Sequence, residues 1–320
     1  MKLGKTALGA ALLAFSALAT AQSYPTKAVQ MVVAFTPGSA VDIVGRIVAE
    51  RLSQMWGQPV VSDNRAGAGG SIGSAVVARA APDGYTLLVT SNAHIVNPSI
   101  FAKLPYDTLK DFTDIVLFVE QPNVMVVATE SRYKTLKDLV DAAKAKPGSL
   151  NIGHAGIGSG THLNTEKFIA AAGIQVVEVP FKGTPEVVAA ILSGNVDGYW
   201  APISAALSFV KSGKVRPLAV STSKRNPTMA DVPTTAEAGT KNSESSLWVA
   251  LWGPAGMSPE LVNKINGDAR KALADPGTKS KLENLGNTTV DLSAADFAKL
   301  VREELGSTRR LLQKAGVKPQ

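Results

Sequence analysis

Thr36-Pro37-Gly38-Ser39-Ala40-Val41-Asp42 and Ala155-Gly156-Ile157-Gly158-Ser159-Gly160-Thr161-His162 are the two stretches that decide the fold of this chain. The first follows the apolar run 29–35, the second follows 150–153, and a helical pattern begins after each. Both are therefore predicted to turn from a strand into a helix N-terminus. The first N–H groups of a helix have no partner inside it, and the helix dipole favours negative charge there. Two such termini predict a clamp for a small anion.

The N-terminal segment is typical of a secretory signal peptide. Lys2 and Lys5 precede or flank the small and apolar stretch 6–18, and Ala19-Thr20-Ala21 forms an A-x-A cleavage site. We expect residues 1–21 to be removed and the mature protein to be exported. The chain of 320 residues has no cysteine, so neither a lipid anchor nor a disulfide is expected.

Composition argues against several other classes. The formal net charge is +7, but lysine and arginine are spread along the chain without interleaved aromatic residues, so nucleic acid is not an expected partner. No later segment has 18 uninterrupted apolar residues, so no membrane span is expected. The three histidines, His94, His154 and His162, lack i, i+4 spacing, and neither a metal site nor a cofactor is expected.

Two enzymatic interpretations fail on spacing. Gly67, Gly69 and Gly73 miss the pattern of a dinucleotide-binding loop. A nucleophile elbow needs glycine two residues before the serine, and Ile157 stands there relative to Ser159. We therefore expect a binding protein without catalysis.

Short apolar strands alternate with amphipathic helices, which predicts an α/β fold with mixed, mostly parallel sheets flanked by helices. Thr184 is expected to cap a helix that has Pro185 at its first position, and 91–111 reads as irregular. We predict a discontinuous first domain, 22–123 and 250–320, and a second domain, 124–249. Two lobes in this arrangement predict a ligand cleft between them.

Motifs along the whole mature chain resemble one family. They are Tyr24-Pro25, Phe35-Thr36-Pro37-Gly38-Ser39 with Asp42 and Arg46, Asp63-Asn64-Arg65-Ala66-Gly67-Ala68-Gly69-Gly70, Pro82-Asp83-Gly84-Tyr85-Thr86-Leu87-Leu88, Leu104-Pro105-Tyr106-Asp107, His162-Leu163, Val179-Pro180-Phe181-Lys182-Gly183, Asp231-Val232-Pro233-Thr234, Glu237-Ala238-Gly239, Trp248 and Pro254-Ala255-Gly256. In this order they are similar to the periplasmic solute-binding proteins of tripartite tricarboxylate transporters, the Bug family.

The resemblance implies a two-lobed type II periplasmic-binding-protein fold that captures a small organic carboxylate and delivers it to a membrane permease. The cargo classes it leaves open are di- or tricarboxylates, amino acids and aromatic acids. We expect a monomer, and the alternative is a sensor that presents the loaded form to a membrane signalling protein. The ligand-binding residues implied are Phe35, Thr36, Gly38, Ser39, Asp42, Ser91 and Asn92 from the first lobe, and His154, Gly158, Ser159, Thr161, His162, Pro180, Phe181, Lys182 and Asp197 from the second.

Three positions depart from the family pattern. Ser39 stands where a second glycine is usual, Thr36 where proline is usual, and His154 where a small hydroxyl residue is common. All three belong to the predicted clamp, so they bear on the identity of the ligand.

Several of these residues also have a structural interpretation. Asp42 in a first helical turn complements the dipole, and His162 at a helix start caps or packs as readily as it binds. The sequence leaves four roles open for His154. It is a hydrogen-bond donor to the ligand, a cation for a distal carboxylate, a pH-sensitive latch, or a loop residue with no special role. Lys182 fits a solvated turn and Asp197 a turn cap. Trp200, Trp248 and Trp252 are predicted to be core residues.

Overall fold

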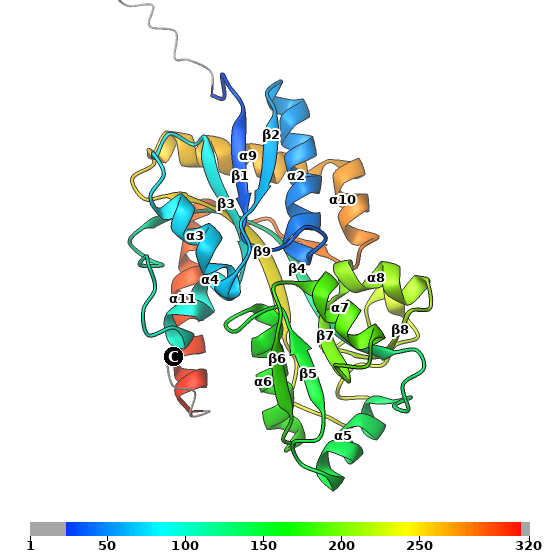
Figure 1. The fold of residues 1–320 in the computed structure, drawn as a ribbon. Coiled ribbons are helices and arrows are strands. Elements are labelled where there is room, and N and C mark those ends of the chain that lie inside the picture. Colours follow the sequence, from blue (N-terminus) through cyan, green and yellow to red (C-terminus); the bar gives the residue numbers. More distant parts are fainter. Residues whose placement is uncertain (1–23, 315–320) are drawn as a thin grey trace, which may run out of the picture.

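Two lobes share one curled sheet in the computed structural model, which describes residues 24–314 (Figure 1). The strand order is β2-β1-β3-β9-β4-β7-β5-β6, and β8 and β10 pair with β4 beside this path. The predicted signal peptide lies outside the described residues. Among the residues that the structure describes, no helix is long and apolar enough to cross a membrane.

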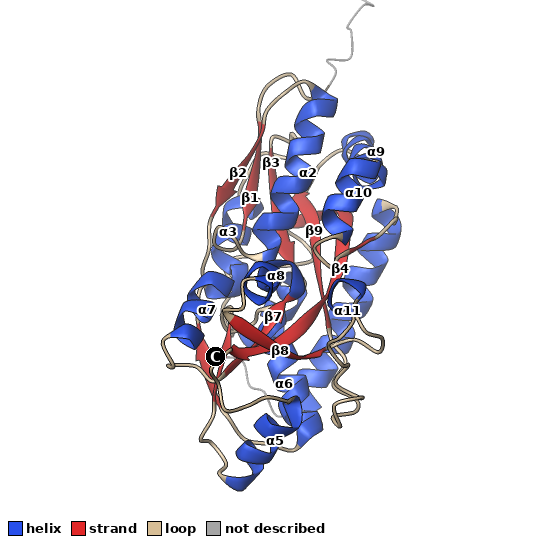
Figure 2. Ribbon diagram, turned by 90° about the vertical axis from the view of Figure 1, so that its right-hand side faces the viewer, coloured by secondary structure: helices blue, strands red, loops and turns tan. Residues whose placement is uncertain are grey.

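The first lobe is built on three parallel strands. Val33 of β1 pairs with Asn64 of β2 on one side and with Val89 of β3 on the other. Strand β9 lies antiparallel between β3 and β4. Helices α2, α9 and α10 pack together beside this sheet (Figure 2). The strands of this lobe are β1 (Val29–Val33), β2 (Val60–Asn64), β3 (Thr86–Ser91), β9 (Ser246–Pro254) and β10 (Thr288–Thr289). Its helices are α2 (Ala40–Trp56), η2 (Ala68–Gly70), α3 (Ser71–Ala78), α4 (Ala93–Ile100), α9 (Pro259–Ala274), α10 (Pro276–Glu283) and α11 (Ala294–Lys314).

The second lobe repeats the strand–turn–helix pattern around β5 and β7, which are parallel. Tyr199 and Trp200 are consecutive in β7 and pack into cores on opposite faces of the sheet, as the alternation along a strand requires. Its strands are β5 (Asn151–His154), β6 (Val177–Pro180), β7 (Gly198–Pro202) and β8 (Val215–Val220). Its helices are α5 (Leu136–Ala145), α6 (Gly160–Ala172), α7 (Thr184–Leu192), α8 (Ile203–Lys211) and η3 (Pro227–Met229).

Strand β4 (Phe112–Ala128) connects the lobes. It pairs with β9 from Phe112 to Pro122 and with β7 from Asn123 to Val126. The change of partner falls at the predicted boundary near residue 123. The domain boundaries themselves stay a prediction, because β4 runs through the first of them and β9 through the second.

Two local expectations were wrong. The stretch 91–111 is not irregular throughout, because it contains α4 with Pro98 inside the helix. Thr184 is the first residue of α7 rather than its cap, and Gly183 precedes the helix instead. The Thr184 hydroxyl lies 3.0 Å from the Tyr199 hydroxyl, so tertiary contact replaces the predicted local one.

Candidate functional site

The two glycine-bearing loops adopt the same geometry. Ser39 precedes α2 with φ −71° and ψ 162°, and Ser159 precedes α6 with φ −68° and ψ 159°. The Ser39 hydroxyl accepts the N–H of Asp42 at 3.3 Å, and the Ser159 hydroxyl accepts that of His162 at 3.2 Å. Each serine therefore satisfies the third N–H of its helix and leaves the first two unpaired within the helix.

Glycines in the left-handed region shape both turns. Gly38 has φ 78° and Gly158 has φ 81°, a conformation that glycine adopts at little cost. The N–H of Gly38 donates to Asp42 Oδ2 at 2.9 Å, and that of Gly158 donates to His162 Nδ1 at 3.2 Å. Asp42 and His162 thus occupy equivalent places in the two loops.

The Asp42 carboxylate is hydrogen-bonded within the first lobe. It also accepts from Arg46 Nε at 2.9 Å and from Asn64 Nδ2 at 2.8 Å, and the residue is only 3% exposed. This network fixes the first loop and favours the structural interpretation of Asp42 over contact with a ligand.

One narrow cavity lies between the two helix starts. The first two residues of each helix line it: Ala40 and Val41 of α2, and Gly160 and Thr161 of α6. The N–H groups left over by the serine caps therefore border one space from opposite lobes. Of the predicted site residues, the structure brings five to this cavity: Phe35, Ser39, Ser91, Ser159 and Thr161. The remaining lining residues are Ala155, Thr184, Tyr199, Pro202 and Leu247.

Thr184 and Tyr199 are cavity residues that sequence reasoning missed. Their hydroxyls lie 3.0 Å apart and are buried. Burial raises the pKa of Tyr199 well above its usual value, although hydrogen bonds to Thr184 and Thr161 oppose the rise. The phenol therefore stays protonated and can donate a hydrogen bond. No local motif marks either residue, because each reaches the cavity only through the packing of α7 against β7.

The lobes meet closely around the cavity. A Cβ atom on Gly69 of the first lobe would lie 2.4 Å from the carbonyl oxygen of Ile157 in the second. A Cβ atom on Gly183 would lie 2.0 Å from Thr36 Oγ1 across the same cleft. The cavity itself measures about 20 Å³, close to the space of one water molecule. A ligand larger than a water molecule can therefore enter only when the lobes move apart.

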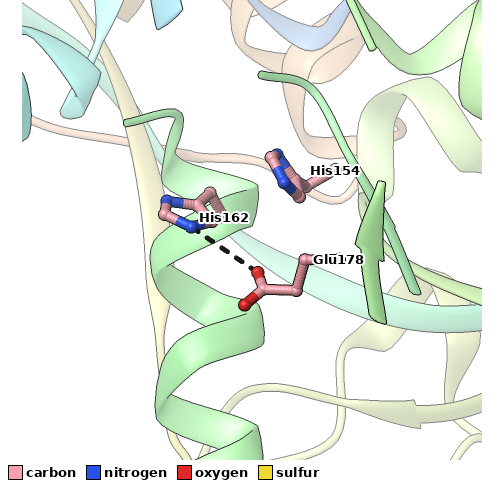
Figure 3. A group of neighbouring side chains, drawn as sticks. All are labelled: His154, His162 and Glu178. Carbon is pink, nitrogen blue, oxygen red and sulfur yellow. Dashed lines mark ion pairs between the residues drawn. The ribbon is translucent and has the colours of Figure 1, made fainter. Parts of the chain in front are cut away.

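His154 and His162 lie beneath the second loop, beside Glu178 of β6 (Figure 3). The two imidazole centroids are 4.6 Å apart, and His162 Nε2 lies 3.5 Å from Glu178 Oε2 and 3.7 Å from Glu166 Oε1. Burial lowers the pKa of His154 to about 3 and lowers that of His162 as well. Burial and the neighbouring Glu166 raise the pKa of Glu178 to about 8. Neither histidine lines the cavity, so His154 does not face a ligand there.

The other predicted residues lie outside the cavity lining. Lys182 and Pro180 are exposed, and Phe181 packs against the core of the second lobe. Asp197 precedes β7, at the end of the strand opposite Pro202, and accepts the N–H of Asn151 at 2.8 Å. Asp197 is therefore not a cavity residue, and its carboxylate makes a structural contact with β5 instead. Thr36, Gly38 and Gly158 belong to the two glycine-bearing loops but do not line the cavity.

Asn92 lines a different and larger hollow of about 630 Å³ between α4, α6 and α11. None of the first two residues of α2 or α6 lines this hollow, so its size does not make it the better candidate for the predicted clamp. Trp200, Trp248 and Trp252 are buried in hydrophobic cores, as predicted.

Comparison with known proteins identifies the chain. The model of a family described as the tripartite tricarboxylate transporter family receptor matches residues 44–317. The chain belongs to this family. The receptor family consists of periplasmic solute-binding proteins, so the predicted class and the two-lobed fold are confirmed.

Three relatives show how far the likeness extends. Protein BugT of Bordetella pertussis is 32% identical to this receptor over 301 residues, which are 93% of this chain and 92% of BugT. The solved structure of R. palustris Rpa4515 with adipate has a TM-score of 0.89 and 31% identity, and the match covers 93% of this chain and all of that one. MatC from Rhodopseudomonas palustris with bound malate has a TM-score of 0.85 and 30% identity, over 90% of this chain and all of MatC.

Proposed function

We propose that this receptor captures a small dicarboxylate in the cavity between α2 and α6 and releases it to a membrane permease of the tripartite tricarboxylate type. One observation carries the proposal: the free N–H groups at two helix starts, one from each lobe, border a single cavity. Relatives with adipate and with malate support a cargo with two carboxylates.

The lining explains how an anion is held without a cationic side chain. Its residues are apolar or carry hydroxyls, and none is lysine, arginine or histidine. The ligand charge would be balanced by the two helix dipoles and by hydroxyl donors such as Ser91 and Tyr199. Charge-assisted hydrogen bonds of this kind contribute about 1.5–3 kcal/mol each, and micromolar affinity corresponds to about 8 kcal/mol, so three or more of them are needed.

Binding without catalysis fits the same geometry. Ser159 accepts from the His162 backbone, while the His162 ring accepts from Gly158. The serine hydroxyl and the imidazole are therefore each engaged in the loop, and they do not form a nucleophile–base pair. We infer a monomeric periplasmic protein that its permease recognises in the closed form. The sensor role considered from the sequence gains no support from the relatives, whose descriptions name transport and periplasmic binding.

Isothermal titration calorimetry against a matched ligand set tests the proposal. Adipate, malate and succinate carry two carboxylates, hexanoate carries one, and adipamide replaces both carboxylates of adipate by neutral amides. We expect at least one dicarboxylate to bind with micromolar or better affinity and the amide at least about tenfold more weakly than its acid. Equal affinity for adipate and adipamide, or silence towards all dicarboxylates with binding of neutral solutes, would overturn it.

A further inference from the structure

We infer that His154, His162 and Glu178 form a binding site for a divalent transition metal such as zinc, separate from the carboxylate cavity. The three residues come from β5, α6 and β6, and Figure 3 shows their side chains gathered in one place. Candidate ligand atoms of all three lie within 4.8 Å of one another. Two imidazole nitrogens and a carboxylate oxygen are a donor set that zinc accepts in proteins.

Unsatisfied polar atoms point to a missing partner at this place. His154 is 1% exposed, yet its Nδ1 has no hydrogen-bond partner. Glu178 Oε2 is buried too, and its contact with His162 Nε2 is too poor in geometry to count as a hydrogen bond. Buried polar atoms are nearly always paired, because burial removes the water that would otherwise hydrogen-bond to them. An imidazole nitrogen and a carboxylate oxygen are both metal ligands. A cation bound between His154 and Glu178 would give each of these buried atoms a partner.

A fourth donor is within reach. Glu166 lies one turn along α6 from His162, and its Oε1 is 3.7 Å from His162 Nε2. Glu166 and Glu178 therefore approach the same imidazole nitrogen from two elements. A divalent cation bound there would therefore be offered carboxylate oxygens from two elements.

The side chains must move a short way to enclose a metal. Ligand atoms around tetrahedral zinc lie about 3.3 Å apart, given bonds of about 2.0–2.1 Å. Rotation of the Glu178 carboxylate and of the two imidazole rings covers the difference from the separations seen here. The terminal side-chain torsion of glutamate and of histidine joins an sp³ carbon to a planar group, and such torsions have broad energy minima.

His162 has to exchange one hydrogen bond for the metal. Its Nδ1 accepts the Gly158 N–H, so the ring proton sits on Nε2, which faces the carboxylates. Metal at Nε2 moves that proton to Nδ1 and breaks the bond to Gly158. The exchange gives up one neutral hydrogen bond and gains a bond from the metal to an imidazole nitrogen.

Zinc titration of the purified, tag-free protein tests the site. We expect a one-to-one complex with micromolar or better affinity by calorimetry, and visible ligand-field absorption when Co²⁺ is bound instead. His154→Asn and Glu178→Gln should each weaken zinc binding at least about tenfold. His94→Phe is the matched control, because His94 is the remaining histidine of the sequence and is buried elsewhere among aromatic rings. It should bind zinc as the wild type does.

Melting temperatures measured on each variant separate loss of the site from loss of the fold. Affinity weaker than millimolar in the wild type would overturn the inference. So would zinc binding that survives both His154→Asn and Glu178→Gln in folded protein. Carboxylate titrations of the same samples make the two proposals independent, since the cavity can bind its ligand whether or not the metal site exists.

Discussion

Ser39 and Ser159 cap two helices from opposite lobes and line the same cavity. Each hydroxyl satisfies the third N–H of its helix, so the first two N–H groups remain for a ligand. The two caps have nearly identical backbone angles, although the loops share little sequence beyond Gly-Ser. The site is thus built from the same serine-capped helix start in both lobes, and it forms only when the lobes meet.

Ala40→Pro should weaken dicarboxylate binding at least about tenfold without unfolding α2. Proline is accepted at the first helical position, and the extended backbone of Ser39 suits a residue before proline. The substitution removes one N–H that borders the cavity. Ala40→Ser keeps that N–H and is the control, expected within about threefold of wild type by calorimetry. Equal affinity of Ala40→Pro and wild type would exclude this N–H as a ligand donor.

Gly183→Ala should hinder closure of the lobes and lower ligand affinity about tenfold or more. Gly183 has φ 179°, which alanine adopts freely, but the new methyl group would lie 2.0 Å from Thr36 Oγ1 across the cleft. The double variant Gly183→Ala/Thr36→Ala removes the clashing hydroxyl and should recover most of the affinity. Because alanine is a weaker helix cap than glycine, the single variant should lose about 1 kcal/mol of stability. A single variant that binds normally would show that this contact is not needed for binding.

Tyr199→Phe should reduce dicarboxylate affinity about tenfold, because it removes a buried hydroxyl donor from the cavity. The loss should be the same at pH 6 and pH 8, since the raised pKa of Tyr199 keeps the phenol protonated throughout. Thr184→Ser retains the partner hydroxyl and should bind normally. Calorimetry at both pH values measures the effect, and wild-type affinity for Tyr199→Phe would remove this residue from the binding site.

His94 should make the protein less stable in mild acid. Its ring packs against Phe112 and Trp252, and burial lowers its pKa from 6.5 to about 3. Below pH 6.5 the His94 ring is protonated in the unfolded chain but stays neutral in the folded protein. The free energy of unfolding therefore falls as the pH drops towards 3. The loss from this residue should be about 2 kcal/mol between pH 7 and pH 5.

His94→Phe should abolish that part of the pH dependence and be at least as stable at pH 7, because neither ring nitrogen of His94 has a hydrogen-bond partner. Urea unfolding of both proteins at pH 7 and pH 5 measures the difference. Identical pH profiles for the two proteins would contradict the buried, neutral state of His94.

The sequence predicted the parts of this molecule that depend on local chemistry. Glycines in the left-handed region and serine caps are read from the residues themselves, so both turns and both helix starts appear where they were expected. The tertiary partners were not predictable in this way. No pattern in the sequence marks Tyr199 as a binding residue, and only the packing of α7 brings Thr184 to its hydroxyl.

The histidine pair shows the same limit. His154 and His162 are eight residues apart, which is no recognised ligand spacing in a single helix, and Glu178 follows on another strand. The turn after β5 folds α6 back so that the two rings meet at 4.6 Å. The position of Asp197 shows the same limit. Its contact with Asn151 depends on the pairing of β5 with β7, which no local pattern gives.

The position of β9 between β3 and β4 has a consequence for the order in which the chain folds. Residues 246–254 fill a gap left by strands that end more than a hundred residues earlier, at Ser91 and Ala128. Until the ribosome has made most of the polypeptide, the β3 and β4 edges lack the strand that joins them. Contacts so distant along the chain form slowly. A nascent chain of this topology stays loosely structured for longer than one whose strands pair with near neighbours in sequence.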